Sequence, residues 1–326
     1  MDYPSYLNAY NNGVLEKVVE TIWQGLSSCQ LCPRMCKVNR LEDRKGFCQT
    51  GLKARVYSFF PHSGEEPPIS GWMGSGTIFF SGCNMRCLYC QNYEFSQNGL
   101  GEQVTPQELA KIMLFLQKQG CHNINLVTPT HVLPQILKAI YLAIPQGLNL
   151  PIVYNTSGYD RYEIIKLLEG IVDIYLPDMR YADRELSLKY SQAQDYPYYN
   201  MAAVEQMHRQ VGVAQMDEYG LVKKGLIIRH LVLPNGISGT EKIMQFISQR
   251  LSKETHISLM SQYLPCYKAS QFKELSRRIS LQEYEAAQDI MARNGLNNAW
   301  IQDGHGLKRL AGVNIRPVAK EGISNC

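Results

Sequence analysis

The chain has 326 residues, of which 45% are hydrophobic and 19% are charged, so it can bury a large core as one main domain. Its net charge of +4 is spread over 33 basic and 29 acidic residues, which disfavours a nucleic-acid partner. No apolar run approaches 18 residues and the first residues are polar, so we expect no membrane span, no secretory leader and a cytoplasmic location.

Ten cysteines in a chain of this length are more typical of metal ligands than of disulfides. Four of them, Cys29, Cys32, Cys36 and Cys48, form a group whose spacing predicts a closed metal site. Zinc and an auxiliary iron–sulfur cluster are both compatible with four thiolates. We favour a structural metal over scattered free cysteines, because a short polar segment gains folding energy from metal. An excess of basic residues would offset thiolate charge or face an acidic partner. The basic residues are Arg34, Lys37, Arg40, Arg44, Lys45, Lys53 and Arg55, against Glu42 and Asp43.

Three further cysteines, Cys83, Cys87 and Cys90, lie within eight residues on a loop that follows strand-like residues 77–80 and turns at Gly82. A structural zinc site usually has four ligands in separated pairs, and a ferredoxin cluster needs a fourth nearby cysteine, which is missing after Cys90. Three thiolates instead leave one iron of a four-iron cluster open to a small chelating molecule. The spacing therefore indicates a cluster that takes part in chemistry.

Strands and helices alternate along the rest of the chain. Residues 105–108 form a capping box with proline at the first helical position, and a second capping box begins at Ser280. Such alternation gives a parallel sheet with right-handed crossovers, closed or nearly closed into a barrel of about six βα units. We expect strands at residues 77–80, 124–127, 152–156, 173–176, 225–233 and 257–264, and helices near 161–168 and from 240 over about a dozen residues.

The carboxyl ends of parallel strands meet at one edge of a barrel, so polar residues there are expected to face the cluster. Asp178 and Arg180 place opposite charges at one strand end, although a solvated ion pair would give the same pattern. His131 and His230 are equally compatible with structural histidines. The candidates are Thr130, His131, Asn155, Ser157, Asp178, Arg180, Arg229, His230, Gln262 and Tyr263.

The spacing Cys-x3-Cys-x2-Cys, with Tyr89 before the last cysteine, resembles the radical SAM superfamily, whose members use S-adenosylmethionine (SAM). Four other sequence words resemble its pyruvate formate-lyase-activating-enzyme-like branch. They are Cys90-Gln-Asn92, Asn125-Leu-Val-Thr-Pro-Thr-His131, Asp173-Ile-Tyr-Leu-Pro-Asp178 and Arg229-His-Leu-Val-Leu-Pro234. The resemblance covers residues 29–305 and implies a partial (β/α)6 TIM-like barrel. We expect an N-terminal helix and the cysteine-rich metal-binding segment in residues 1–70, and the barrel with a C-terminal extension in 71–326.

The resemblance implies an oxidoreductase that cleaves SAM. A reduced [4Fe–4S] cluster on Cys83, Cys87 and Cys90 would donate one electron to SAM, methionine would leave, and the 5′-deoxyadenosyl radical would abstract hydrogen from the substrate. Arg180 would bind the SAM carboxylate and Asp178 would accept a hydrogen bond. The superfamily's Gly-Gly-Glu-Pro-like segment for the SAM amino group is replaced here by residues 128–131, which leaves that contact unassigned. The expected cofactor-binding residues are Tyr89, Thr130, His131, Asn155, Ser157, Asp178, Arg180 and Arg229.

The implied partners are an electron donor such as flavodoxin or ferredoxin and, as a protein substrate, a glycyl radical enzyme. The four-cysteine group lies upstream of the motif, unlike the inserted ferredoxin-like domains of many activases, so the substrate stays open. One alternative is a radical SAM enzyme that modifies a peptide, nucleic acid or small metabolite; another is a non-enzymatic metal-binding interaction protein. The polar residues 181–219 form either a substrate-facing excursion or packed helices, and Gly304 and Gly306 are expected in a turn.

Overall fold

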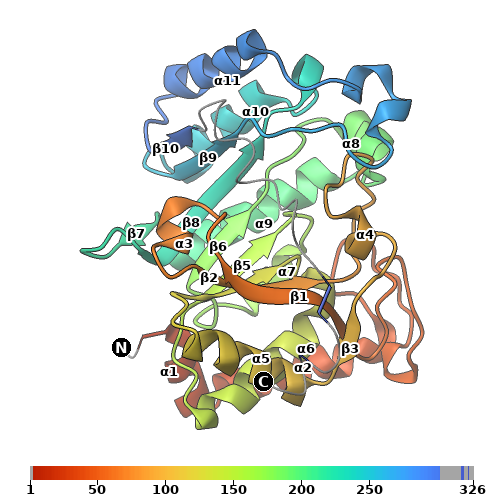
Figure 1. The fold of residues 1–326 in the computed structure, drawn as a ribbon, viewed down its shortest axis with the longest axis vertical. Helices are drawn as coiled ribbons and strands as arrows, with labels where there is room; N and C mark the ends of the chain where they lie inside the picture. Colours follow the sequence, from red (N-terminus) through yellow and green to blue (C-terminus); the bar gives the residue numbers. More distant parts are fainter. Residues whose placement is uncertain (1–2, 302–316, 319–321, 323–326) are drawn as a thin grey trace.

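The computed structural model describes residues 3–301, 317, 318 and 322, and a single mixed β-sheet forms its centre (Figure 1). Within these residues, seven strands run parallel in the order β10-β9-β8-β6-β5-β4-β2, and the antiparallel β1 and β3 extend the sheet beyond β2. The short β7 pairs with β8. The strands are β1 Ala54–His62, β2 Ser75–Phe80, β3 Glu102–Val104, β4 Ile124–Val127, β5 Ile152–Thr156, β6 Ile174–Pro177, β7 Gln215–Met216, β8 Val222–Leu231, β9 His256–Met260 and β10 Ala299–Ile301.

The predicted α/β fold with a parallel sheet is confirmed. Strands β4 and β5 have the predicted bounds, and six parallel strands from β2 to β9 correspond to the expected βα units. Strand β10 adds a seventh. In the described part of the chain the end strands β3 and β10 do not pair, so the barrel is partial.

Several predicted boundaries were wrong. Strand β9 ends at Met260, because residues 262–264 leave the sheet and line a large cavity. Strand β8 covers Val222–Leu231 instead of 225–233, β6 starts one residue late, and the helix expected at 161–168 is the shorter α7, Tyr162–Lys166. Residues 181–219 form mainly α8, Arg184–Ser191, and α9, Tyr196–Val211. None of these residues lines the cavity, so the interpretation as packed helices is correct. The predicted turn at Gly304 and Gly306 lies outside the described residues.

Local sequence signals explain where the longer helices begin. At α5 the Thr105 hydroxyl accepts the Glu108 amide at 3.2 Å, and the Glu108 carboxylate accepts the Thr105 amide at 2.7 Å. Ser280 and Glu283 make the same pair of contacts at α11, which confirms both predicted capping boxes.

No helix in the described residues is both long and apolar enough to cross a bilayer. The helices are α1 Ser5–Asn11, α2 Val14–Gln24, α3 Pro67–Ser70, α4 Tyr93–Ser96, α5 Pro106–Lys118, α6 Leu133–Ala143, α7 Tyr162–Lys166, α8 Arg184–Ser191, α9 Tyr196–Val211, α10 Thr240–Phe246, continued by a π-helix at Ile247–Leu251, and α11 Leu281–Arg293.

The first 70 residues share their core with the barrel. Leu15 and Ile22 of α2 belong to the same buried cluster as Ile136 and Ile140 of α6, and α2, α5 and α6 pack together beside the sheet (Figure 1). Strand β1 pairs with β2 over most of its length. The N-terminal segment is therefore packed against the barrel over a wide area.

The short helix α3 packs against the inner face of the barrel. Its Ile69 lies in one buried cluster with Val153 of β5 and Ile227 of β8, whereas the alternate residues Tyr154 and Ile228 belong to the main core. The Asn123 side chain donates to the Ile69 carbonyl at 2.7 Å and fixes α3 there. Residues 62–70 therefore lead from β1 into the interior of the barrel.

Candidate active site

The loop after β2 brings Cys83, Cys87 and Cys90 close to one another, and each sulfur has a hydrogen-bond partner. The Met85 amide donates to Cys83 Sγ at 3.4 Å, and the hydroxyls of Ser191 and Ser96 lie 3.0 and 3.1 Å from Cys87 Sγ and Cys90 Sγ. Donors aimed at sulfur stabilise thiolates. All nine cysteines that the structure describes are free of disulfides.

The electrostatics of these thiols fit metal ligation. Burial raises the pKa of Cys83 to about 12, and the nearby Cys87 and Cys90 add to the effect. Burial likewise raises the pKa of Cys90 to about 11. Without a metal, both thiols are protonated at neutral pH, and a metal must displace the protons. Within the described residues, no three His, Cys, Asp or Glu side chains could hold one metal ion. A four-iron cluster offers each thiolate its own iron, so three buried thiols with separate donors fit a cluster.

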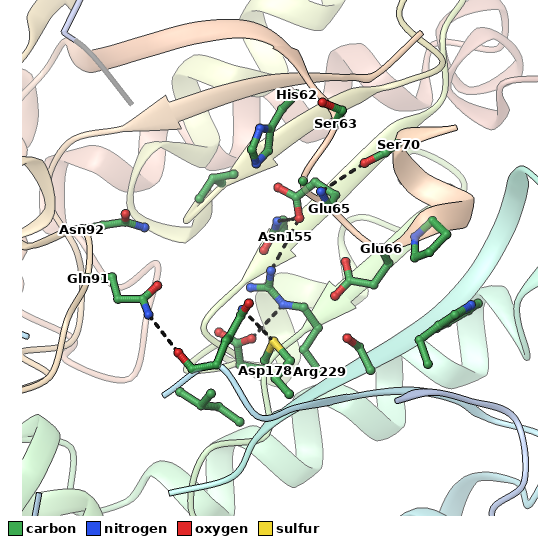
Figure 2. Close-up of a pocket in the computed structure, with 18 of the residues that line it drawn as sticks. His62, Ser63, Glu65, Glu66, Ser70, Gln91, Asn92, Asn155, Asp178 and Arg229 are labelled. Atoms are coloured by element: carbon green, nitrogen blue, oxygen red, sulfur yellow. Dashed lines mark hydrogen bonds and ion pairs between the residues drawn. The ribbon is translucent and has the colours of Figure 1, made fainter. Parts of the chain in front are cut away.

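A cavity of about 1100 Å³ lies beside the cysteine loop (Figure 2). It is lined at one place by Tyr89 and Cys90, and elsewhere by side chains from the inner face of the strands. Val127, Asn155, Asp178, Arg229 and Met260 come from the carboxyl-end halves of β4, β5, β6, β8 and β9 or from the residue that follows. The topology thus brings polar groups from five strands to a space next to the predicted cluster.

Two arginines and two carboxylates form a buried network in this cavity. Asp178 accepts from Arg180 at 2.5 Å and from Arg229 Nε at 2.9 Å. Arg229 also lies 3.7 Å from Glu65, which accepts from the Asn155 amide at 3.5 Å. Burial alone would raise the pKa of Asp178, but the two guanidinium groups outweigh it and lower the pKa below its usual value. Asp178 is therefore ionised at neutral pH.

The structure places the predicted site residues in two sets. Tyr89, Asn155, Asp178, Arg180 and Arg229 line the cavity, together with Gln262 and Tyr263. Arg180 also points one nitrogen at Cys87 Sγ, 3.9 Å away. The solvated ion pair considered for Asp178 and Arg180 is excluded, because both side chains are largely buried.

Thr130, His131, Ser157 and His230 do not line the cavity. The Thr130 hydroxyl donates to the buried Asp160 at 2.6 Å, and His131 Nε2 lies 2.9 Å from the Ser81 carbonyl. His230 is bonded to Met179 and Thr240. Burial lowers the pKa of both histidines to about 4, so they are neutral. Thr130, His131 and His230 thus bond to neighbouring protein groups instead of facing the cavity.

Sequence reasoning missed Glu65 and Glu66, which both line the cavity and are more than nine-tenths buried. They precede Pro67 and Pro68, a composition typical of an exposed turn. Their buried position depends on the insertion of α3, which leaves no local sequence signal except the apolar Ile69.

The four N-terminal cysteines surround a small cavity of their own. Cys29, Cys32, Cys36 and Cys48 line it, together with His131. The Phe47 amide donates to Cys36 Sγ at 3.5 Å, and the buried Arg40 donates to Cys29 Sγ at 3.8 Å. Burial, reinforced by Cys48, raises the pKa of Cys32 far above its usual value. The four thiols thus line one small cavity, although no three of them are placed to hold a single ion in the side-chain arrangement that the structure describes.

Comparison with known proteins gives the family. Residues 77–211 match the Radical SAM superfamily. A protein of Methanocaldococcus jannaschii, Uncharacterized protein MJ0674, is 33% identical over 296 residues, which cover 87% of this chain and 80% of that protein. A second protein of that organism, Uncharacterized protein MJ0808, is 23% identical over 298 residues, with coverage of 84% and 80%.

Two solved structures resemble the fold. Streptococcus suis SuiB bound to the precursor peptide SuiA has a TM-score of 0.47 at 10% identity, and the match covers 68% of this chain. The present chain spans 47% of SuiB, about half of its length. The FeFe-hydrogenase maturase HydG from Carboxydothermus hydrogenoformans has a TM-score of 0.47 at 13% identity, with 96% of this chain and 72% of HydG covered.

Proposed function

The chain belongs to the radical SAM superfamily, and from this premise we propose that it cleaves SAM reductively and acts on a substrate in the cavity beside Cys90. The observation that carries the proposal is that Cys90, the last cysteine of the Cys83 loop, and the Asp178–Arg180–Arg229 network line the same cavity. The family implies a [4Fe–4S] cluster and SAM as cofactors.

Cys83, Cys87 and Cys90 would hold three irons and leave the fourth open. When bound, the cluster supplies one electron to SAM, whose sulfur–C5′ bond breaks to give methionine and a 5′-deoxyadenosyl radical. Arg180 is buried near Cys87 and its Nε has no partner in the described residues, which supports a contact to the SAM carboxylate. Asp178 fixes the orientation of Arg180 and accepts a further hydrogen bond.

Electron paramagnetic resonance of the anaerobically reconstituted and reduced protein tests the cofactor assignment. We expect about four irons per chain at the Cys83 loop and a cluster signal that changes when SAM is added, because SAM would bind the open iron. A cluster signal that stays unchanged when SAM is added would contradict the proposal of an open iron.

We also propose that Cys29, Cys32, Cys36 and Cys48 hold a second, structural metal. Four thiols around one cavity, with donors at Cys36 and Cys29, support this proposal. A closed set of four thiolates leaves no open position for chemistry. Zinc and an iron–sulfur cluster are distinguished by elemental analysis of protein purified without oxygen.

The surface around the second site offers a place for an electron donor. Lys37, Arg44 and Lys45 are exposed in the segment that carries the four cysteines, and this segment contacts the Cys83 loop, where Arg34 donates to the Asn84 carbonyl at 3.0 Å. We propose that an acidic flavodoxin or ferredoxin docks there. The cytoplasm, where such donors and reduced clusters persist, is the proposed location.

The substrate class is proposed from the sequence words of the pyruvate formate-lyase-activating-enzyme-like branch. Asp178 is the last residue of one of those words and Arg229 is the first residue of another. Both line the cavity, and this supports a substrate that enters beside them. A glycyl radical enzyme is the protein substrate that the branch suggests. Incubation of the reduced protein and SAM with such a partner would give a glycyl radical doublet, and its absence would favour another peptide or a small metabolite.

A further inference from the structure

Glu66 is a buried carboxyl with an oxygen that has no partner. Its Oε2 makes no hydrogen bond in the described residues, although the residue is only 8% exposed and lines the cavity. Ser258 contacts the carboxyl group as a hydrogen-bond donor. A buried polar atom without a partner costs free energy, so a protein keeps one where a ligand supplies the missing contact.

The cavity has one carboxylate more than it has cations. Arg180 is paired with Asp178, and Arg229 is shared between Asp178 and Glu65. Glu66 has no ion pair of its own among the described residues, and burial lowers the pKa of His62, which is therefore neutral. Burial also raises the pKa of Glu66, and Arg229 only partly offsets this effect, so the ionised form of Glu66 needs a further cation. Among the described residues no ion pair supplies that cation to Glu66.

Glu66 lies away from the cysteine loop. Figure 2 shows Glu66 across the cavity from Gln91 and Asn92, which follow Cys90 directly, with Glu65 between them beside Asn155. SAM would bind the open iron through its amino and carboxylate groups, so its ammonium group would lie at the cysteine loop. The Glu66 carboxyl group would then face the part of the cavity that is left for a substrate.

We propose that Glu66, with Glu65 beside it, binds an amino or guanidino group of the substrate. This inference rests on the proposed function, because it names the substrate class of the same cavity. The cationic group would donate a hydrogen bond to Glu66 Oε2 and balance the charge of the ionised carboxylate. It would thereby hold the substrate beside SAM.

Thermal melting of the anaerobic, metal-loaded protein without SAM or reductant tests this. The probes are 1,4-diaminobutane and its neutral isostere 1,4-butanediol at matched ionic strength. We expect the diamine to raise the melting temperature saturably and the diol to leave it unchanged. Glu66→Gln should weaken the diamine response about 10- to 150-fold, the range of a charge-assisted hydrogen bond. Glu285→Gln, which changes an exposed carboxylate, is the matched control and should respond as the wild type does.

Equal responses to diamine and diol, or an unchanged response in Glu66→Gln, would overturn the inference. A Glu66→Gln protein that fails to fold would also overturn it, because the carboxylate would then be structural. The proposed function is judged separately, by SAM cleavage in the wild type. If the wild type binds the diamine through Glu66 but makes no 5′-deoxyadenosine, the cation site is supported and the proposed function is contradicted.

Discussion

The carbonyl oxygen of Cys48 lies so close to Gly82 that a Cβ atom at residue 82 would stand 2.6 Å from it. Gly82 directly precedes Cys83, and its φ of +87° is in the region that favours glycine. The two cysteine groups, which are far apart in the sequence, are therefore in direct backbone contact. The N-terminal group supports the loop that would carry the catalytic cluster.

Replacement of Gly82 by alanine tests this contact. The left-handed conformation alone costs about 1 to 2 kcal/mol for alanine, and the clash with a backbone atom adds to that cost. Gly147→Ala is the matched control, because Gly147 has a φ of +96° with nothing within 4 Å. In denaturant unfolding we expect Gly82→Ala to lose more stability than Gly147→Ala and to bind less iron. Equal losses would show that the Cys48 contact is unimportant.

Replacement of Cys32 by alanine tests the second metal site. We expect the loss of about one metal centre per chain and a lower melting temperature, because a four-thiolate site stabilises the fold only with its full ligand set. Cys121→Ala, at another buried free cysteine, is the control and should keep its metal. Elemental analysis decides, and an unchanged metal-to-protein ratio in Cys32→Ala would rule out a site there.

Replacement of Arg180 tests the SAM pocket. Loss of a charge-assisted contact to the carboxylate should weaken SAM binding roughly 10- to 150-fold in Arg180→Ala. Lysine should restore only part of it, because an ammonium group lacks the planar fork. Arg184→Ala removes an exposed ion pair to Asp195 and serves as the control. Equilibrium binding gives the dissociation constant for SAM. A value for Arg180→Ala within twofold of that of the wild type would contradict the assignment of Arg180 to the SAM pocket.

Charge reversal at Lys37, Arg44 and Lys45 tests the docking of an electron donor. With reduced flavodoxin as donor, we expect SAM cleavage in the triple glutamate variant to be at least about tenfold slower and less sensitive to salt. With dithionite, which needs no docking, the rate should match the wild type. An equal slowing with both reductants would indicate damage to the cluster region instead.

The elements that sequence predicted well are those whose signals are local. Residues 124–127 and 152–156 are short runs with several large apolar residues, and both are buried along their whole length in β4 and β5. The capping box at Thr105 needs only side chains three residues apart. Asp178 and Arg229 line the cavity as expected from their places near strand ends, because a βα pattern fixes where strands end.

The missed parts depend on long-range packing. Glu65 and Glu66 reach the cavity only because Ile69 packs between β5 and β8, which the local composition does not indicate. Thr130 was expected to face SAM, yet Thr128 adopts a φ of +60° and the chain turns so that Thr130 bonds the buried Asp160. Such choices among hydrogen-bond partners are made by the folded environment and not by the spacing of residues.

The formation of 5′-deoxyadenosine is the most direct test of the central claim. Anaerobically reconstituted wild type should release it from SAM after reduction with dithionite. Cys87→Ala should release none above background, because the two remaining thiolates, Cys83 and Cys90, cannot hold a four-iron cluster with only one open iron. Ser191→Ala, which removes the hydroxyl 3.0 Å from Cys87 Sγ, should keep the cluster and cleave SAM more slowly. Product formation by Cys87→Ala at the wild-type rate, or none by the wild type, would contradict the account.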